Sequence, residues 1–386
     1  MGKFLNAVYR NKDGYHLGER PKDKSIIKIN ANESPYPPSP RILEAVTKDI
    51  LHEQNLYSDP KSTKLTQAIA EYYHVNQDEV FADSGSDVIL AYCLLAYGKG
   101  GVGFCFPDVT YFFYKTFSTF FNVPFAEIPV GPDFSISAED YCACSRNVLL
   151  ANPNAPSGLV LSPEEIERIV ASNPDRLVII DEAYIDFRNA SCVPLIRKYD
   201  NLIVIQTMSK SRNLAGARIG FAVSSPKNIE DLNTMKAAFN PDSINSISQA
   251  LGYEAVKDVG YMNECVAKIV SVREKTRKAL LGRGFDVLES HTNFLFCRPA
   301  LIPAPELYRK LKENGVLVRH FDQPRLRDYI RMSIGTEKQM DAVLEKIDRI
   351  SSEYASVPRK ATGHPSVRQR TAPAAGAFQN AKELAR

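Results

Sequence analysis

A lysine lies between a hydroxyl residue and an arginine in the segment Thr207-Met208-Ser209-Lys210-Ser211-Arg212-Asn213-Leu214-Ala215-Gly216-Ala217-Arg218. Ser209 immediately precedes Lys210, and Arg218 follows eight positions later. Hydroxyl and guanidinium groups donate hydrogen bonds to a phosphate, whereas an amine reacts with an aldehyde. Together the three groups indicate that Lys210 holds pyridoxal phosphate (PLP) covalently. A solvated lysine in a polar loop is the alternative, and this segment alone does not separate the two.

Apolar runs bounded by turn residues flank this segment and recur before it. The strand-like runs are Val148–Ala151, Leu177–Ile180, Leu202–Gln206 and Ile219–Val223. Between the first two, Ser162 and Pro163 precede two glutamates and an apolar period, which is typical of a helix start. Such strand–helix alternation predicts an α/β fold with a mostly parallel sheet covered by helices on both faces. The ligand site of such a sheet lies at the carboxyl ends of its strands.

The pattern changes from about residue 256. A long amphipathic helix near Tyr261–Leu281 is followed by short strands and helices up to Ile350, which indicates a smaller α+β unit. The run Ile26–Asn30 is expected to form a strand that packs with it. We therefore predict an N-terminal segment (1–44) packing with the small domain, a large domain (45–255) and a small domain (256–353). The remaining residues (354–386) are predicted to form a disordered tail, because they include few apolar side chains.

Composition excludes several classes of protein. The chain of 386 residues is 44% hydrophobic and 24% charged, and its net charge of +3 comes from interspersed residues of both signs, so we expect no nucleic-acid partner. No apolar run approaches the ~20 residues that span a bilayer. The seven cysteines are scattered through apolar stretches, as free thiols in a reducing compartment are. The pair Cys142 and Cys144 has no second pair or histidine nearby to complete a metal site. A cytoplasmic protein without membrane or metal partners is expected.

Two polar residues end a strand upstream of the lysine. Asp181 follows the run Leu177–Ile180, and Tyr184 lies three residues further on. A carboxylate at this depth can pair with a protonated pyridine nitrogen, and the Tyr184 hydroxyl can bind the phenolic oxygen of the cofactor. The alternative is a strand-ending acid that caps a loop or binds a metal.

Three further segments follow the same logic. In the rigid turn Asn152–Gly158, Asn154 either satisfies turn backbone groups or donates to the phenolic oxygen. The residues Gly85, Ser86 and Asp87 open an apolar helix, whose exposed N–H groups suit a phosphate, although an ordinary helix start would look the same. Tyr111 is either a stacking partner for a planar ring or one more aromatic core residue.

Taken together, these segments resemble the fold-type I PLP-dependent aminotransferases over about Asn30 to Ile350. The matching segments are Asn30–Tyr36, Tyr57–Pro60, Gly85–Asp87, Asn152–Gly158, Asp181–Tyr184, Ser209–Gly220 and Arg331–Thr336. The resemblance implies a three-layer α/β/α large domain with a mostly parallel seven-stranded sheet, and a smaller α+β domain.

The resemblance also implies roles for the matching residues. Lys210 would form the internal aldimine and move the substrate proton, with Asp181 on the pyridinium, Asn154 and Tyr184 on the phenolic oxygen, and Tyr111 on the ring face. Tyr57 would reach the phosphate of a neighbouring subunit, so a homodimer is implied. The expected phosphate-binding residues within one chain are Gly85, Ser86, Asp87, Thr207, Ser209 and Arg218.

Within the family, the similarity is greatest to enzymes that act on histidinol phosphate. It implies a ping-pong reaction that interconverts histidinol phosphate plus 2-oxoglutarate with imidazole acetol phosphate plus glutamate. The expected substrate-binding residues are Arg331, Arg319, Tyr15 and Asn32. Val88 and the N-terminal segment around Tyr15 depart from the family pattern, which leaves the substrate open. An aromatic amino acid aminotransferase, a threonine-phosphate decarboxylase and a non-catalytic protein of this fold are the alternatives.

Overall fold

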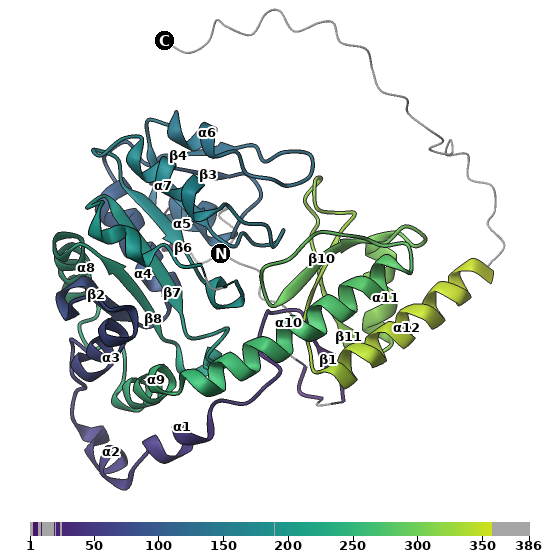
Figure 1. Ribbon diagram of the computed structural model, residues 1–386, viewed down its shortest axis with the longest axis horizontal. Coiled ribbons are helices and arrows are strands. Elements are labelled where there is room, and N and C mark those ends of the chain that lie inside the picture. Colours follow the sequence, from purple (N-terminus) through teal and green to yellow (C-terminus); the bar gives the residue numbers. More distant parts are fainter. Residues whose placement is uncertain are drawn as a thin grey trace, which may run out of the picture.

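The computed structural model describes residues 3–6, 9, 19, 21–23, 25–188 and 190–356. Figure 1 shows a large unit built on a central sheet and a smaller unit beside it, with the helix α10 (Val259–Leu281) running from one to the other. The predicted α/β class is therefore confirmed.

The central sheet has seven strands in the order β2-β8-β7-β6-β5-β3-β4. All neighbours are parallel except that β8 runs antiparallel to both β2 and β7, which confirms the predicted mostly parallel sheet. The strands are β2 (Val80–Asp83), β3 (Phe104–Pro107), β4 (Phe125–Ile128), β5 (Asn147–Ala151), β6 (Val178–Asp181), β7 (Leu202–Thr207) and β8 (Gly220–Ser224).

Side chains alternate along these strands between two buried faces. In β6, Val178 and Ile180 join one apolar cluster, whereas Ile179 joins the other. The first cluster includes side chains of α3 (Thr63–Tyr73), α6 (Ala138–Cys142), α7 (Pro163–Ala171) and α9 (Ser246–Lys257). The second includes side chains of α4 (Ser86–Cys93), α5 (Phe113–Phe121) and α8 (Pro226–Phe239). Burial on both faces explains why the strand sequences are apolar throughout.

The start of α7 shows how closely local chemistry follows the sequence. Ser162 Oγ accepts from the N–H of Glu165 at 3.2 Å, and Glu165 Oε2 accepts from the N–H of Ser162 at 2.7 Å. Pro163 occupies the first helical position, where no N–H partner is needed. This capping box confirms the predicted helix start.

The small unit has a four-stranded sheet in the order β12-β13-β10-β9. Its elements are β9 (Asp286–Val287), β10 (Phe294–Arg298), α11 (Ala304–Glu313), β11 (Val316–Leu317), β12 (Arg319–His320), β13 (Ile330–Ser333) and α12 (Glu337–Ser356). The last helix extends past the predicted end at Ile350 and three residues into the predicted tail, because Tyr354 still packs against the core. Residues 357–386 lie outside the described part of the chain.

The N-terminal segment contacts both units. β1 (Ile27–Lys28) pairs in parallel with β11, as a strand near Ile26 was expected to do with the small unit. The helix α1 (Pro40–Ala45) instead lies against the large unit, where Arg41 pairs with Glu254 of α9 at 3.1 Å. The short helix α2 (Lys48–His52) follows. Residues 40–57, which include α1 and α2, form the arm that protrudes from the large unit in Figure 1.

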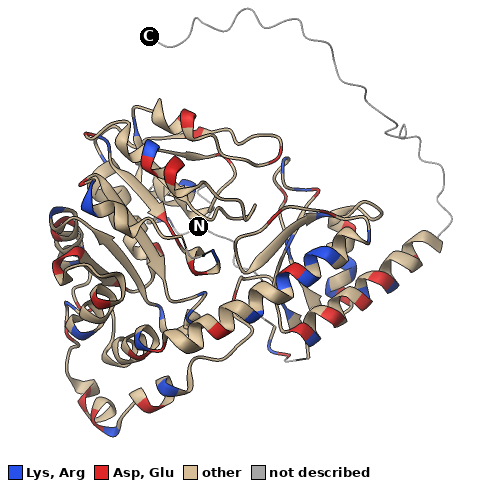
Figure 2. Ribbon diagram, viewed as in Figure 1, with Lys and Arg blue, Asp and Glu red and all other residues tan. Residues whose placement is uncertain are grey.

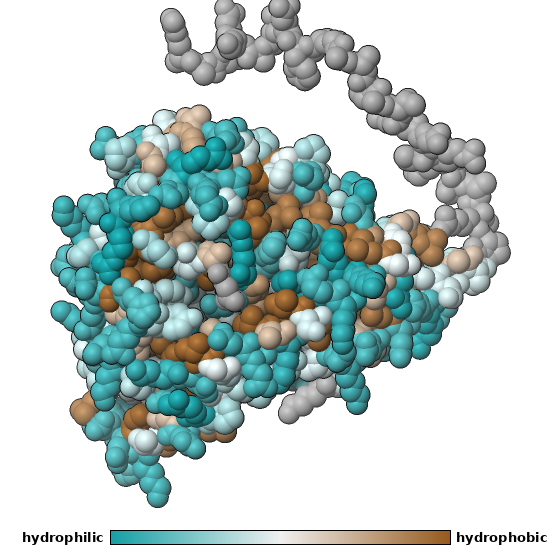
Figure 3. Space-filling model, in the orientation of Figure 1, coloured by the Kyte–Doolittle hydropathy of each residue, from teal (hydrophilic) through white to brown (hydrophobic). Residues whose placement is uncertain are grey.

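Surface chemistry agrees with the composition. Residues of both charges are interspersed along α10 and α12 (Figure 2). Apolar residues appear in several separate places on the face in view, among mostly hydrophilic residues (Figure 3). Among the described residues, no helix is both long and apolar enough to cross a bilayer.

Candidate active site

A cavity of about 740 Å³ lies at the carboxyl ends of the central strands. Its volume is in the range of small-molecule sites. It brings together most of the predicted cofactor residues, namely Ser86, Asp87, Tyr111, Asp181, Tyr184, Thr207, Ser209, Lys210 and Arg218. Parallel strands place their carboxyl ends at one edge, which is why residues from four separate segments meet here.

Lys210 occupies the turn after β7, and its Nζ lies 5.7 Å from the centre of the Tyr184 ring. The Tyr184 hydroxyl accepts a hydrogen bond from Asn32 Nδ2 at 2.8 Å. Because a hydroxyl both accepts and donates, this bond leaves the Tyr184 proton available for an oxygen in the cavity. Asn32 itself is buried and also accepts from the Ser333 hydroxyl at 3.0 Å, so it supports Tyr184 from behind the cavity wall.

Asp181 ends β6 and is almost fully buried. Its Oδ2 accepts from the Tyr114 hydroxyl at 2.8 Å, and its Oδ1 accepts from the N–H of Ala183 at 3.1 Å. Burial raises the pKa of Asp181 to about 6, although the Tyr114 and Ala183 donors oppose the rise. A cation placed beside this carboxylate would therefore gain a strong partner in a site of low polarity.

The N-terminus of α4 and two glycines form a tight cradle on the other side of the cavity. A Cβ on Gly220 would lie 2.2 Å from the backbone nitrogen of Ser86, and a Cβ on Gly85 would lie 2.7 Å from Arg218 Nη2. Gly85 also has a φ of +95°, which a residue with a side chain rarely adopts. The bare backbone therefore lets β8 and the Arg218 guanidinium approach the N–H groups that open α4.

Charged and hydroxyl groups surround this cradle. Asp87 Oδ2 lies 3.5 Å from Arg218 Nη2, and Asp87 Oδ1 accepts from the Tyr111 hydroxyl at 2.9 Å. The hydroxyls of Thr207 and Ser209 lie 2.9 Å apart on the same wall. Donors from a helix start, an arginine and two hydroxyls are the groups that hold a phosphate.

Asn154 is not among the residues that line the cavity. Its Nδ2 donates to the carbonyl of Val109 at 2.9 Å and to Ser157 Oγ at 3.3 Å, and its Oδ1 accepts from Thr110 Oγ1 at 2.7 Å. The Asn154 amide thus links the turn Asn152–Gly158 to residues 109 and 110, which follow β3. Pro153 and Ala155 line the cavity in its place.

Of the expected substrate residues that the structure describes, Arg319, Arg331 and Asn32 are not among those that line the cavity. Arg319 of β12 and Arg331 of β13 face each other as cross-strand neighbours. The Arg331 guanidinium lies 5.3 Å from the centre of the Phe294 ring, and that ring lies edge-on to Tyr184 at 5.3 Å. Arg331, Phe294, Tyr184 and Lys210 thus form a series of neighbours, each within 6 Å of the next, that leads from β13 to the cavity.

Two expected residues are elsewhere. Tyr57 lies in the arm, after α2. Its side chain is 91% exposed and does not line the cavity of its own chain. Tyr15 lies outside the described residues.

Sequence reasoning missed several residues of this site. Tyr114 was hidden in an aromatic stretch, and only its spacing of three from Tyr111 hinted at a shared direction. Lys28 and Glu33, which form an ion pair, line the cavity from the N-terminal segment, as does Ala31. Ala31 and Glu33 belong to the segment Asn30–Tyr36 that resembles the family, but only Asn32 of that segment was expected at the site.

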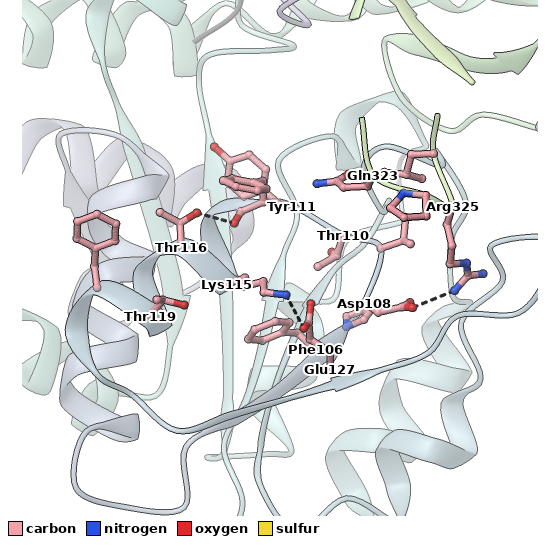
Figure 4. A pocket seen from close by; sticks show the side chains of 16 residues that line it. Phe106, Asp108, Thr110, Tyr111, Lys115, Thr116, Thr119, Glu127, Gln323 and Arg325 are labelled. Atoms are coloured by element: carbon pink, nitrogen blue, oxygen red, sulfur yellow. Dashed lines mark hydrogen bonds and ion pairs between the residues drawn. The ribbon is translucent and has the colours of Figure 1, made fainter. Parts of the chain in front are cut away.

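A second cavity of about 530 Å³ lies on the other side of Tyr111 (Figure 4). It opens between the start of α5 and residues 323–326 of the small unit, and Arg325 bridges the two by pairing with Asp108 at 2.9 Å. Lys210 does not line it, so the first cavity is the candidate active site.

Comparison with known proteins agrees with this geometry. Residues 24–347 match the family model "Aminotransferase class I and II". The chain belongs to this family. It is 44% identical over 351 residues to a histidinol-phosphate aminotransferase of Brachyspira hyodysenteriae, covering 91% of this chain and 99% of that protein. It is 40% identical to the enzyme of that name from Clostridium acetobutylicum, covering 90% and 99% of the two chains.

A solved structure shares the fold. The histidinol-phosphate aminotransferase of Sinorhizobium meliloti, crystallised with pyridoxal 5'-phosphate, superposes with a TM-score of 0.77 at 22% identity, covering 85% of this chain and 91% of that one. The predicted fold-type I architecture is thereby confirmed.

As a class I and II aminotransferase, the protein uses PLP, and the cavity fits that cofactor. The glycine cradle leaves room for a phosphate, Asp181 supplies a buried carboxylate for the ring nitrogen, and Lys210 supplies the amine. A PLP-dependent transferase is the enzyme class that this family implies, as expected from the sequence.

Proposed function

We propose that the protein is a histidinol-phosphate aminotransferase that interconverts histidinol phosphate plus 2-oxoglutarate with imidazole acetol phosphate plus glutamate. The observation that carries the substrate assignment is the Arg319–Arg331 pair. The register of β12 and β13 places these two arginines opposite each other, and guanidinium groups are the donors that suit the several oxygens of a phosphate. Two relatives of this name at 44% and 40% identity support the same assignment.

In this proposal, Ser86, Asp87, Ser209 and Arg218 hold the PLP phosphate, and Asp181 holds the ring nitrogen. Bound PLP supplies an electron sink for the electrons left when a C–H proton departs. Lys210 would hold the cofactor through its amine, and the same amine would accept and deliver the substrate proton. Tyr184, supported by Asn32, donates to the phenolic oxygen.

The substrate would approach from the side of the small unit. Arg319 and Arg331 would receive its phosphate. The N-terminal segment, which already supplies Lys28 and Glu33 to the cavity, would enclose the remainder of the substrate.

Half-reactions test the substrate directly. The PLP-loaded enzyme is mixed in turn with histidinol phosphate, phenylalanine and threonine phosphate, and loss of the absorbance of lysine-bound PLP is followed in each. We expect the specificity constant, which is the rate constant divided by KM, to be highest for histidinol phosphate. A preference for phenylalanine, or release of carbon dioxide from threonine phosphate, would overturn the assignment.

The Lys210→Ala variant tests whether Lys210 is the catalytic amine. It removes the only amine that the proposal uses, so we expect loss of the visible absorbance band and a fall in kcat of at least about 10³-fold. Retained transamination would contradict the mechanism. A colourless wild-type protein would instead favour a non-catalytic role.

We further propose that the enzyme is a homodimer of the cytoplasm. Leu43 is 82% exposed and Tyr57 is 91% exposed on the same arm, and Leu51 and Leu56 are exposed beside them. Exposed apolar side chains at this density are typical of an interface. A second subunit covering this arm would let Tyr57 reach the phosphate end of its neighbour's cavity. The free state of all seven cysteines fits a reducing compartment.

A further inference from the structure

Two cysteines lie in contact away from the cavity. The Sγ atoms of Cys105 and Cys144 are 2.6 Å apart, and both residues are free thiols. Cys105 lies in the middle of β3, and Cys144 lies in the loop between α6 and β5. The strand period turns Phe104 and Phe106 toward one face of the sheet and Cys105 toward the other, where α6 packs.

The two thiols differ in access. Cys105 is fully buried, whereas Cys144 is partly exposed at the edge of the same apolar cluster. A reagent from solution therefore meets Cys144 first. The buried thiol is in position to attack whatever forms on Cys144.

A buried cation lies beside this pair. Arg176 is 2% exposed, and its guanidinium donates to the carbonyls of Tyr141, Cys144 and Ile169 and to the Ser172 hydroxyl. Its Nε has no hydrogen-bond partner, and no carboxylate pairs with it among the described residues. A buried guanidinium that is balanced only by neutral oxygens stabilises a nearby anion.

The charges around the pair separate Cys144 from the other cysteines. The pKa of Cys144 is lowered to about 6, chiefly by the Cys105 thiol as a hydrogen-bond donor and also by Arg176 and Arg146, and that of Cys105 is raised. Burial raises the pKa of Cys93, Cys192 and Cys297. A thiolate with a neighbouring thiol donor is the arrangement found in reactive dithiols.

We propose that Cys105 and Cys144 form a reversible disulfide on exposure to low-molecular-mass disulfides such as oxidised glutathione. The Cys144 thiolate attacks one sulfur of the reagent, its S–S bond breaks, and one glutathione thiolate leaves and takes up a proton. The Cys105 thiol then loses its proton and attacks the Cys144 sulfur, which releases the second glutathione. The protein dithiol is oxidised, and one oxidised glutathione is reduced to two thiols.

The inference does not depend on the proposed substrate. Neither cysteine lines the cavity that contains Lys210, so thiol oxidation and transamination are separate measurements. Transient disulfides of this kind occur in reducing compartments as sensors or as protection against irreversible oxidation of a reactive thiol.

The test uses the full-length, PLP-loaded enzyme in buffers of reduced and oxidised glutathione. After acid quenching and digestion without reductant, we expect a peptide pair linked through Cys105 and Cys144, and two fewer titratable thiols than the seven of the reduced chain. Reduced glutathione should reverse both changes. The Cys142→Ser variant is the matched control, because it removes the adjacent thiol and should leave the linked peptide pair in place.

Two further variants identify which cysteine attacks the reagent and which one releases the adduct. Cys144→Ser should abolish the linkage, and Cys105→Ala should leave a stable glutathione adduct on Cys144. In the reduced wild-type enzyme, the rate of Cys144 alkylation by iodoacetamide should be half-maximal near pH 6, compared with about 8.5 for an ordinary thiol. A linkage to Cys142, a wild-type adduct that never resolves to Cys105, or alkylation only above pH 8 would each overturn the proposal. The wild-type peptide map decides even if Cys105→Ala fails to fold.

Discussion

At the scale of single residues, the site depends on how each polar group is occupied by its neighbours. Asn154 and Asp181 both follow central strands, yet only Asp181 lines the cavity, because the Asn154 amide is bonded to Val109, Thr110 and Ser157. Asp181 in turn keeps its orientation through Tyr114. The two residues therefore differ in what their neighbours leave free: both ends of the Asn154 amide are hydrogen-bonded within the turns, whereas the Asp181 carboxylate has further lone pairs for a ligand.

Tyr114→Phe tests the support of Asp181. The hydroxyl donates to the carboxylate at 2.8 Å and so favours its ionised form. Removing it should raise the pKa of Asp181 further above its usual value, so the loss of activity on the acid side should begin at a higher pH, by about one unit. We expect kcat to fall on the order of tenfold, because the carboxylate also loses its fixed orientation. The pH profile of kcat/KM measures the shift.

Tyr73→Phe is the matched control for this variant. Its hydroxyl also donates to a buried acceptor, Gln206 Oε1, but neither residue lines the cavity. We expect a loss of stability with an unchanged pH profile. Equal profiles for Tyr114→Phe and the wild type would show that Tyr114 only fills space.

At the scale of elements, the phosphate end depends on how closely β8 approaches the start of α4. The two elements are more than a hundred residues apart in sequence, and no side chain fits between Gly220 and Ser86. Gly220 ends the antiparallel pairing with both β2 and β7, so the glycine cannot move away without breaking the sheet. Because Gly220 has no side chain, the N-terminus of α4 can lie directly against β8.

Gly220→Ala should displace this helix start. The added Cβ would meet backbone atoms at 2.2 to 2.8 Å, which only a shift of the chain can relieve. We expect a loss of about 1–3 kcal/mol in the free energy of unfolding, as is typical of overpacking. The Kd for PLP should rise at least about tenfold, because each 1.4 kcal/mol corresponds to a factor of ten. PLP titration and denaturant unfolding measure the two effects.

Gly260→Ala provides the comparison. Gly260 lies in the first turn of α10, where an added Cβ has space, and alanine favours helices over glycine. Stability should stay the same or increase, and PLP binding should not change. A normal Kd for PLP in Gly220→Ala would contradict the cradle as the phosphate site.

At the scale of the whole molecule, three parts of the chain meet behind the cavity. Asn32 of the N-terminal segment donates to Tyr184 of the large unit and accepts from Ser333 of the small unit, and its carbonyl accepts from Asn293 at 3.0 Å. Tyr57, in contrast, is exposed and does not line the cavity of its own chain.

Mixing two variants tests the shared site of the proposed homodimer. Lys210→Ala and Tyr57→Ala should each lose most activity alone. In a heterodimer of the two, one site regains both native residues while the other lacks both. Random subunit exchange should therefore restore up to about a quarter of wild-type activity, since half of the dimers are mixed and each has one intact site of two.

Sedimentation of the wild type supplies the control for this experiment. A dimer is expected at micromolar concentration. An active monomer, or a mixture no more active than the mean of its parents, would contradict a shared site.

The fold was largely predictable because its signals are local. The apolar runs that predicted β5, β6, β7 and β8 differ from the observed strands by at most one residue at each end. The gathering of Asp181, Tyr184, Ser209 and Lys210 followed from the rule that ligands bind at the carboxyl ends of parallel strands. The hydrogen bonds of Asn154 and the ring contacts of Arg331 could not be predicted in the same way, because side-chain direction depends on the partners that packing supplies.

By itself, the sequence determined the order of elements, the family and the reactive groups, since capping, strand period and turn chemistry act between neighbouring residues. Only the tertiary structure decided which of those groups face the cavity, that Tyr114 supports Asp181, and that Cys105 of a strand meets Cys144 of a loop. The physical reason is that contacts between distant segments depend on strand register and on the shapes of whole packed surfaces. Neither can be read from a segment alone.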